Sequence, residues 1–204
     1  MLLPIHEEMT REAIGEHFSE RAMEIILAAN FKQDSLRNLI GHDELHYDND
    51  ISKGDRYIIE QRGLVIATML TPGVLGAWIA FGRMLHTVQD FYSHTNYVTL
   101  WLDEHTGSTP AEIDPVRKDL LQSPSLHSGK VFFPLDYLYF VPGMKDFALK
   151  HLPHNSHGRM NLDSPAQGEK FPYARAAAIK RSVHEFELLK KLLTPEMFAR
   201  FVDR

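Results

Sequence analysis

Two histidines and an aspartate recur at four-residue intervals in FGRMLHTVQDFYSHTNYV, residues 81–98. Residues four apart lie one above the other on nearly the same face of an α-helix, so a helix here would align His86, Asp90 and His94. Imidazole nitrogens and carboxylate oxygens together suit Zn²⁺ and related divalent ions. The spacing therefore predicts a metal-binding helix face. The structural alternative is a helix with two hydrogen-bonded histidines and a surface aspartate.

Further side chains of the metal-ligand type come before this segment. His6 stands directly before two glutamates that suit the first turn of a helix, and Asp34 follows a second predicted helix that begins after Ser19. Residues 41–50, GHDELHYDND, hold two histidines and four acidic residues. Packing alone does not explain this density, although a solvated charged loop would also have it. These additional donors favour the metal-binding interpretation.

Apolar periodicity predicts the helices that must position the donors. We expect one helix over residues 52–70, a break at Thr71-Pro72-Gly73, the central helix over 81–98, a closing amphipathic helix over 173–193 and a tail helix over 195–204. No alternating strand pattern persists along the chain. The sequence therefore predicts an all-α fold, with residues 1–204 forming a single compact multi-helix domain.

Composition narrows the classes of function. The net charge of −5 and the pI of about 6.2 argue against a broad basic surface for duplex nucleic acid. Cysteine is absent, so a metal would need nitrogen and oxygen ligands. Residues 63–82 carry no charge over nearly the length of a membrane span, but the Thr-Pro-Gly break makes two buried helices the better interpretation.

The N-terminus and the aromatic segment after residue 130 give less specific indications. The N-terminus shows no signal peptide, so we expect a cytoplasmic chain or one exported by another route. Residues 131–143, VFFPLDYLYFVPG, are aromatic and interrupted by prolines. We interpret them as a wall of the core or of a pocket, with a lipid-facing lip as the alternative.

Several segments together resemble a known family. HEEMTREA, AANFKQD, LHYDN, GRMLHTVQDFYSHTNYV and HGRMNLDSP resemble the HET-C-type (heterokaryon-incompatibility) proteins. These are similar in turn to the zinc-dependent phospholipase C and P1/S1 nuclease superfamily. The resemblance implies a compact helical domain of the phospholipase C/P1 nuclease type, in which up to three zinc ions cleave phosphodiester bonds.

Carried over position by position, the resemblance also implies a set of metal ligands. The ligands of one metal would be Asp34, His46, His86 and Asp90. Asp90 would bridge to a second metal that also uses His6. The remaining metal would be held by His94, His157 and Asp163. From this correspondence we expect at least one zinc ion, and a second beside it.

The resulting hypothesis is a zinc-dependent phosphodiester hydrolase that uses a metal-activated water, with Asp34 or Asp90 taking the proton of that water. The acidic composition and the aromatic 131–143 segment favour a phospholipase C-like reaction on phospholipid, with peripheral membrane contact, over a nuclease. Two other hypotheses stay open. One is a metal-stabilised interaction protein without catalysis, and the other is a membrane-active HET-C-type protein.

Overall fold

The structure, a computed structural model, consists of helices connected by turns and loops. It describes residues 1–35, 37–39, 41–139 and 141–204. The longer α-helices are α1 (Leu3–Ile14), α2 (Glu20–Phe31), α4 (Ile51–Met69), α5 (Leu75–His94), α6 (Tyr97–Glu104), α9 (Lys145–His151), α11 (Phe171–Leu192) and α12 (Pro195–Val202). Shorter turns of helix are η1 (Lys32–Asp34), α3 (Asp43–His46), η2 (Pro110–Glu112), α7 (Lys118–Leu121), α8 (Leu135–Leu138), α10 (His157–Met160) and η3 (Pro165–Gln167).

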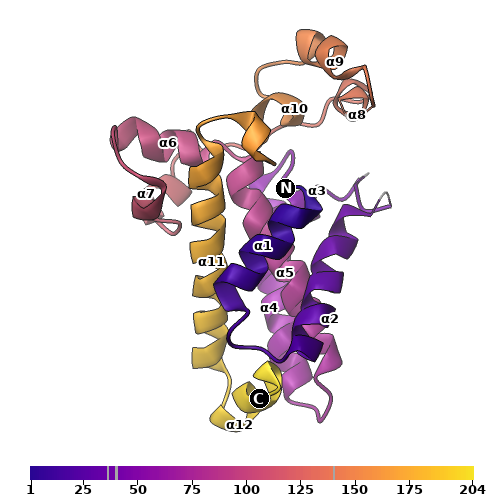
Figure 1. Ribbon diagram of the computed structural model, residues 1–204, viewed down its shortest axis with the longest axis vertical. Coiled ribbons are helices and arrows are strands. Elements are labelled where there is room, and N and C mark those ends of the chain that lie inside the picture. The colour runs from indigo at the N-terminus through magenta and orange to yellow at the C-terminus, as the bar shows by residue number, and fades with distance from the viewer. Residues whose placement is uncertain (36, 40, 140) are drawn as a thin grey trace.

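Helix α5 runs through the centre of the bundle. It packs against the longer helices α1, α2, α4 and α11 and against the short α3, and Figure 1 shows the longer helices arranged around it. Because α5 is covered on so many sides, sixteen of its twenty residues are buried, among them Trp78, Phe81 and Tyr92. The described residues contain two isolated β-bridges and no named strand. The all-α class predicted from the sequence is confirmed.

A glycine sets the close approach of α2 to α5. A Cβ atom added at Gly82 would collide with the carbonyl oxygen of Ile26 and would lie 3.0 Å from the Cβ of Ala29. The missing side chain therefore allows the two helix backbones to pack together one turn before His86. This contact matters for the site, because α2 carries Asn30 on the face that meets His86.

The chain between α7 and α11 forms a separate small layer at one end of the bundle. Its own core contains Tyr139, Ala148 and Leu152, packed against partly buried residues such as Phe132 and Leu135. Figure 1 shows α8 and α9 beyond the end of α5, on the side where the N-terminus also lies. The predicted wall at 131–143 is part of this layer, and Phe140 lies outside the described residues.

One predicted boundary was wrong. The central helix ends at His94 and does not reach Val98, because Thr95 adopts an extended backbone with φ −115° and ψ 166°. Its hydroxyl donates to the carbonyl oxygen of Phe91, and α6 begins two residues later. The predicted helix at 52–70 and the break after it are confirmed. No helix in the described part of the chain has the length and apolarity that a membrane span requires.

We predict that Gly82→Ala lowers the free energy of unfolding by about 1–3 kcal/mol, because the added methyl group forces α2 away from α5. Gly63→Ala is the matched control, since a Cβ at that helical position meets no atom within 4 Å. The control should be neutral or should stabilise by up to about 1 kcal/mol, as expected from helix propensity. Urea unfolding followed by circular dichroism measures both. Equal midpoints for the two variants would contradict this account of the α2–α5 contact.

Candidate metal centre

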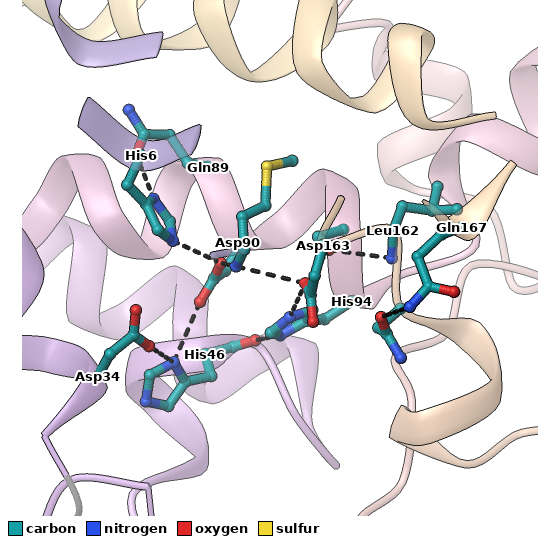
Figure 2. A network of polar contacts seen from close by, with 12 residues as sticks. His6, Asp34, His46, Gln89, Asp90, His94, Leu162, Asp163 and Gln167 are labelled. Atoms are coloured by element: carbon teal, nitrogen blue, oxygen red, sulfur yellow. Dashed lines mark hydrogen bonds and ion pairs between the residues drawn. The ribbon is translucent and has the colours of Figure 1, made fainter. Parts of the chain in front are cut away.

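Four side chains from three elements converge beside the C-terminal half of α5. His86 and Asp90 come from α5, His46 ends α3, and Asp34 ends η1. One ligand atom from each lies within 4.8 Å of all the others, so the group could hold a metal ion. We call these four residues the first cluster. Figure 2 shows Asp90 between His6 on one side and His46 with Asp34 on the other.

The separations inside the first cluster are short. The Oδ2 atom of Asp90 lies 3.0 Å from His46 Nδ1 and 3.0 Å from His86 Nε2. The two ring nitrogens are 3.2 Å apart. The Oδ1 atom of Asp34 completes the set, at 3.8 Å from His46 Nδ1 and 3.6 Å from His86 Nε2. Two nitrogens and two oxygens thus face a common point.

Amide side chains behind the histidines orient their rings. The Nδ1 atom of His86 lies 3.3 Å from Asn30 Oδ1, and the Nδ1 atom of His6 lies 2.6 Å from Gln89 Oε1. An amide oxygen accepts hydrogen bonds, so each imidazole carries its proton on Nδ1 and presents a bare Nε2. Asn30 Nδ2 in turn donates to Gln89 Oε1, so the two amide side chains are linked by a hydrogen bond. Histidines that bind metal through one ring nitrogen typically have such a hydrogen-bond partner at the other.

Two buried ring nitrogens are left without a hydrogen-bond partner. Among the described residues, neither His6 Nε2 nor His46 Nε2 has one. His6 Nε2 lies 3.3 Å from Asp90 Oδ1, and the ring of His6 stacks on that of His86 with centroids 4.4 Å apart. Since buried polar atoms are nearly always paired, an unpaired nitrogen aimed at a carboxylate is what a metal ligand looks like without its metal.

The other oxygen of Asp90 faces a positive group. The amino group of Met1 contacts Asp90 Oδ1 and lies 3.3 Å from Asp163 Oδ1. Burial lowers the pKa of this amino group, but the charges of Asp163, Asp90 and Asp34 outweigh burial and raise it to about 11. Asp90 and Asp163 therefore share one cation in this structure.

A second cluster lies at the C-terminal end of α5. It consists of Asp48, His94 and His157, whose ligand atoms again lie within 4.8 Å of one another. His157 Nδ1 is 2.8 Å from Asp48 Oδ1, and His94 Nε2 is 3.0 Å from Asp163 Oδ1. His94 Nδ1 donates to the backbone oxygen of His46 at 2.7 Å. Both nitrogens of His94 thus have partners, unlike those of His6 and His46.

The two histidines of α5 differ in pKa, because burial and nearby charges act on them differently. Burial lowers the pKa of His86 to about 4, so its imidazole is neutral at pH 7 and able to bind metal. For His94, burial also lowers the pKa, but the charges of Asp90, Asp163 and Asp48 outweigh it and raise the value to about 10. His94 is therefore an imidazolium at neutral pH, and a metal there would have to displace a proton.

One residue with a left-handed backbone conformation separates the two clusters in the loop after α3. Tyr47 has φ 56° and ψ 27°, which ends α3 between His46 of the first cluster and Asp48 of the second. This conformation is unusual for a bulky residue. It is supported by packing, because a Cβ at Gly54 would lie 2.6 Å from the Tyr47 ring. The Tyr47 hydroxyl also donates to Asp55 at 2.6 Å.

A pocket of about 330 Å³ opens onto both clusters. Its polar lining consists of Asp34, His46, Asp48, His94, Asp136, His157 and Asp163. Its apolar lining consists of Met1, Leu2, Leu3, Leu39, Val131 and the ring of Tyr137. No lysine or arginine lines it in the part of the chain that the structure describes. Asp34 and His46 of the first cluster therefore face a pocket that could hold a small ligand with an apolar part, whereas His6, His86 and Asp90 lie buried behind them.

The structure brings together all eight side chains that the sequence analysis selected. His6, Asp34, His46, His86 and Asp90 surround the first cluster, while His94, His157 and Asp163 meet around the second. Their role as metal ligands stays a prediction. Asp48, Asn30 and Gln89 were not among the ligands predicted from the sequence. Asp48 had a signal in the density of acidic residues at 41–50, but nothing in the sequence distinguished it from its neighbours.

The fold and the clusters define an all-α domain with a centre of histidine and aspartate side chains that could hold metal. A family model described as the VWA7 N-terminal domain matches residues 6–107, which is half of the 204-residue chain. The chain belongs to this family. No curated protein and no solved structure matches it.

This family assignment corrects the resemblance drawn from the sequence. The chain had been interpreted as a HET-C-type protein related to the phospholipase C/P1 nuclease superfamily, and that interpretation was wrong. The matched range contains the whole first cluster, together with His6, Asp48 and His94. His157 and Asp163 lie beyond it. What the donors do must therefore be argued from their geometry.

We predict that Asn30→Ala weakens metal binding about 10–100-fold, because it removes the acceptor that orients His86 while keeping every ligand. Competition with a chromophoric chelator measures the affinity. Asn155→Ala, at an exposed turn outside both clusters, is the matched control and should bind like the wild type. Unchanged affinity in Asn30→Ala, with wild-type circular dichroism, would show that the amide has no part in metal binding.

Proposed function

We propose that this chain is a zinc-dependent phosphodiester hydrolase. The observation that carries the proposal is the convergence of the first cluster, two imidazoles and two carboxylates, at the edge of an accessible pocket. Ligands at 2.0–2.1 Å from a tetrahedral zinc ion are about 3.3 Å apart. The five separations given above run from 3.0 to 3.8 Å and bracket this value. The donor set is also one that zinc prefers.

A second zinc ion would use His6 and the Oδ1 atom of Asp90, in place of the amino group of Met1 that contacts this oxygen. Asp90 divides its two oxygens, since Oδ2 faces His46 and His86 while Oδ1 faces His6 and the amino group of Met1. A carboxylate with this arrangement suits a bridge between two metals. A further ion at the second cluster has to compete with the protons of His94, so we place the chemistry at the first cluster and His6.

The roles of the residues follow from their exposure. Bound zinc would lower the pKa of a water molecule toward neutrality and stabilise charge on phosphoryl oxygens. Asp34 lines the pocket and its side chain is 21% exposed, whereas Asp90 is fully buried. Of the two candidate proton acceptors, only Asp34 thus reaches a molecule in the pocket. Asp90 holds metal, and Asn30 and Gln89 keep the imidazoles aligned.

The lining of the pocket favours a phospholipid over a nucleic acid. A polynucleotide site pairs basic side chains with aromatic faces along a groove. Here, the described lining combines acidic and histidine side chains with leucine, valine and tyrosine. A phosphodiester with an apolar part, as in a phospholipase C-like reaction, matches both kinds of side chain. Zinc would add positive charge to a lining in which the described residues include no lysine or arginine.

We predict that protein purified without added metal or chelator contains about one or more zinc ions per chain, and that His86→Ala and Asp90→Ala lose them. Elemental analysis gives the count. His184→Ala and Asp103→Ala are matched controls, because both residues are exposed on helices away from the clusters. A wild-type protein that contains no metal, even after zinc is supplied, would refute the hydrolase.

We also predict slow hydrolysis of bis-p-nitrophenyl phosphate, abolished by 1,10-phenanthroline and restored by zinc. Removal of a residue that only hydrogen-bonds a metal ligand typically lowers activity about 10–100-fold. The hydrolysis rate of His86→Ala should fall further than this, because His86 is itself a ligand. Release of p-nitrophenolate measures the rate, and His184→Ala should match the wild type. Full zinc occupancy without turnover of this probe or of phospholipid would favour the metal-stabilised interaction protein instead.

A further inference from the structure

The layer between α7 and α11 exposes large apolar side chains beside the metal pocket. We call residues 130–139 and 141–160 the cap. Its own small core holds Tyr139, Ala148 and Leu152. Large apolar side chains nevertheless stay outside that core, with Phe133 83% exposed and Phe147 49% exposed. Val141 is exposed as well. The cap therefore presents aromatic and aliphatic groups to its surroundings although it has a core in which to bury them.

These exposed groups continue to the mouth of the metal pocket. The ring of Phe133 lies against that of Tyr137, with centroids 5.6 Å apart, and Tyr137 lines the pocket. Outside the cap, the apolar lining consists of the buried Met1 and three exposed leucines, namely Leu2, Leu3 and Leu39. Scattered exposed apolar residues are ordinary, but a group that surrounds a pocket entrance marks an interaction surface.

The charge of the cap is opposite to that of the chain. The cap carries four basic residues, Lys130, Lys145, Lys150 and Arg159, and two acidic ones, Asp136 and Asp146. Asp136 is buried, and its carboxylate accepts hydrogen bonds from the backbone N–H groups of Phe132 and Gly158. The exposed surface of the cap is thus basic, while the whole chain has a net charge of −5.

We propose that the cap docks on an anionic lipid surface, with Phe133 and Phe147 inserted among the acyl chains and Lys145 and Lys150 near the phosphate groups. Apolar side chains flanked by basic ones are what binds peripheral proteins to anionic membranes. This orientation would turn the pocket mouth toward the bilayer. Docking uses no metal and no catalytic residue. The docking proposal therefore does not depend on whether the chain hydrolyses phosphodiesters.

Co-sedimentation with vesicles tests the proposal. The wild-type chain should bind vesicles of equal parts phosphatidylcholine and phosphatidylserine, and bind phosphatidylcholine vesicles much less. Phe133→Ser and Phe147→Ser should each weaken binding about tenfold or more. Lys145→Glu combined with Lys150→Glu should also weaken it, and binding should fall as salt increases. A zinc chelator should leave it unchanged, which separates this test from that of the hydrolase.

Matched variants show whether the effect belongs to the cap. Ile59→Ser and Leu70→Ser remove apolar side chains that are 62% and 70% exposed, outside the cap, and Lys191→Glu reverses an exposed charge on α11. These variants should bind like the wild type. Docking would be overturned by a wild-type chain that does not bind the anionic vesicles, or by equal losses in cap and control variants. It would also be overturned if sedimentation velocity showed that the wild-type chain is a dimer and that Phe133→Ser is a monomer. A second copy of the chain would then cover this surface.

Discussion

The buried charge of Asp90 is the constraint on which the site depends. Its carboxylate is fully buried in the C-terminal half of α5, and an isolated carboxylate in such a place costs several kcal/mol or more. Burial raises the pKa of this group, but the nearby amino group of Met1 and the histidines His86, His94 and His46 outweigh burial and hold the pKa well below its usual range. Asp90 thus stays ionised only because nitrogens of α5 and of other segments surround it. The fold is arranged so that they do.

Close helix packing supplies those nitrogens at fixed positions. The approach of α2 to α5 at Gly82 places Asn30 behind His86, and the packing of Tyr47 over Gly54 fixes His46 on one side and Asp48 on the other. The rings of His86 and His6 are therefore held by amide side chains as well as by the cluster, and His46 is positioned by the backbone that ends α3. An arrangement of this kind has little freedom to relax, which is how a protein keeps donor atoms together at separations near 3 Å.

The sequence predicted the parts of the site that depend on one helix. His86 and Asp90 are related by helical periodicity, so their alignment needed no tertiary information. Asp48 was missed because its role depends on a left-handed backbone at Tyr47, which has no signature in the sequence. The end of α5 was misplaced because the backbone after it pairs with a distant segment, the N–H of Gly129 donating to the carbonyl oxygen of His94 and the N–H of Asn96 to that of His127. Family membership was misread for a related reason, since metal-ligand spacing reflects chemistry and does not by itself show ancestry.

The two clusters differ in how their charge is balanced without metal. In the second cluster, the imidazolium of His94 lies against Asp163 and near Asp48, so positive charge is already present there. In the first cluster, His86 is neutral and His46 keeps an unpaired Nε2, so the carboxylates of Asp34 and Asp90 rely on the amino group of Met1 and on partial charges. A divalent cation gains more where less positive charge has to be displaced. The first cluster is therefore the one that metal should occupy first, and the second stabilises it from the C-terminal end of the same helix.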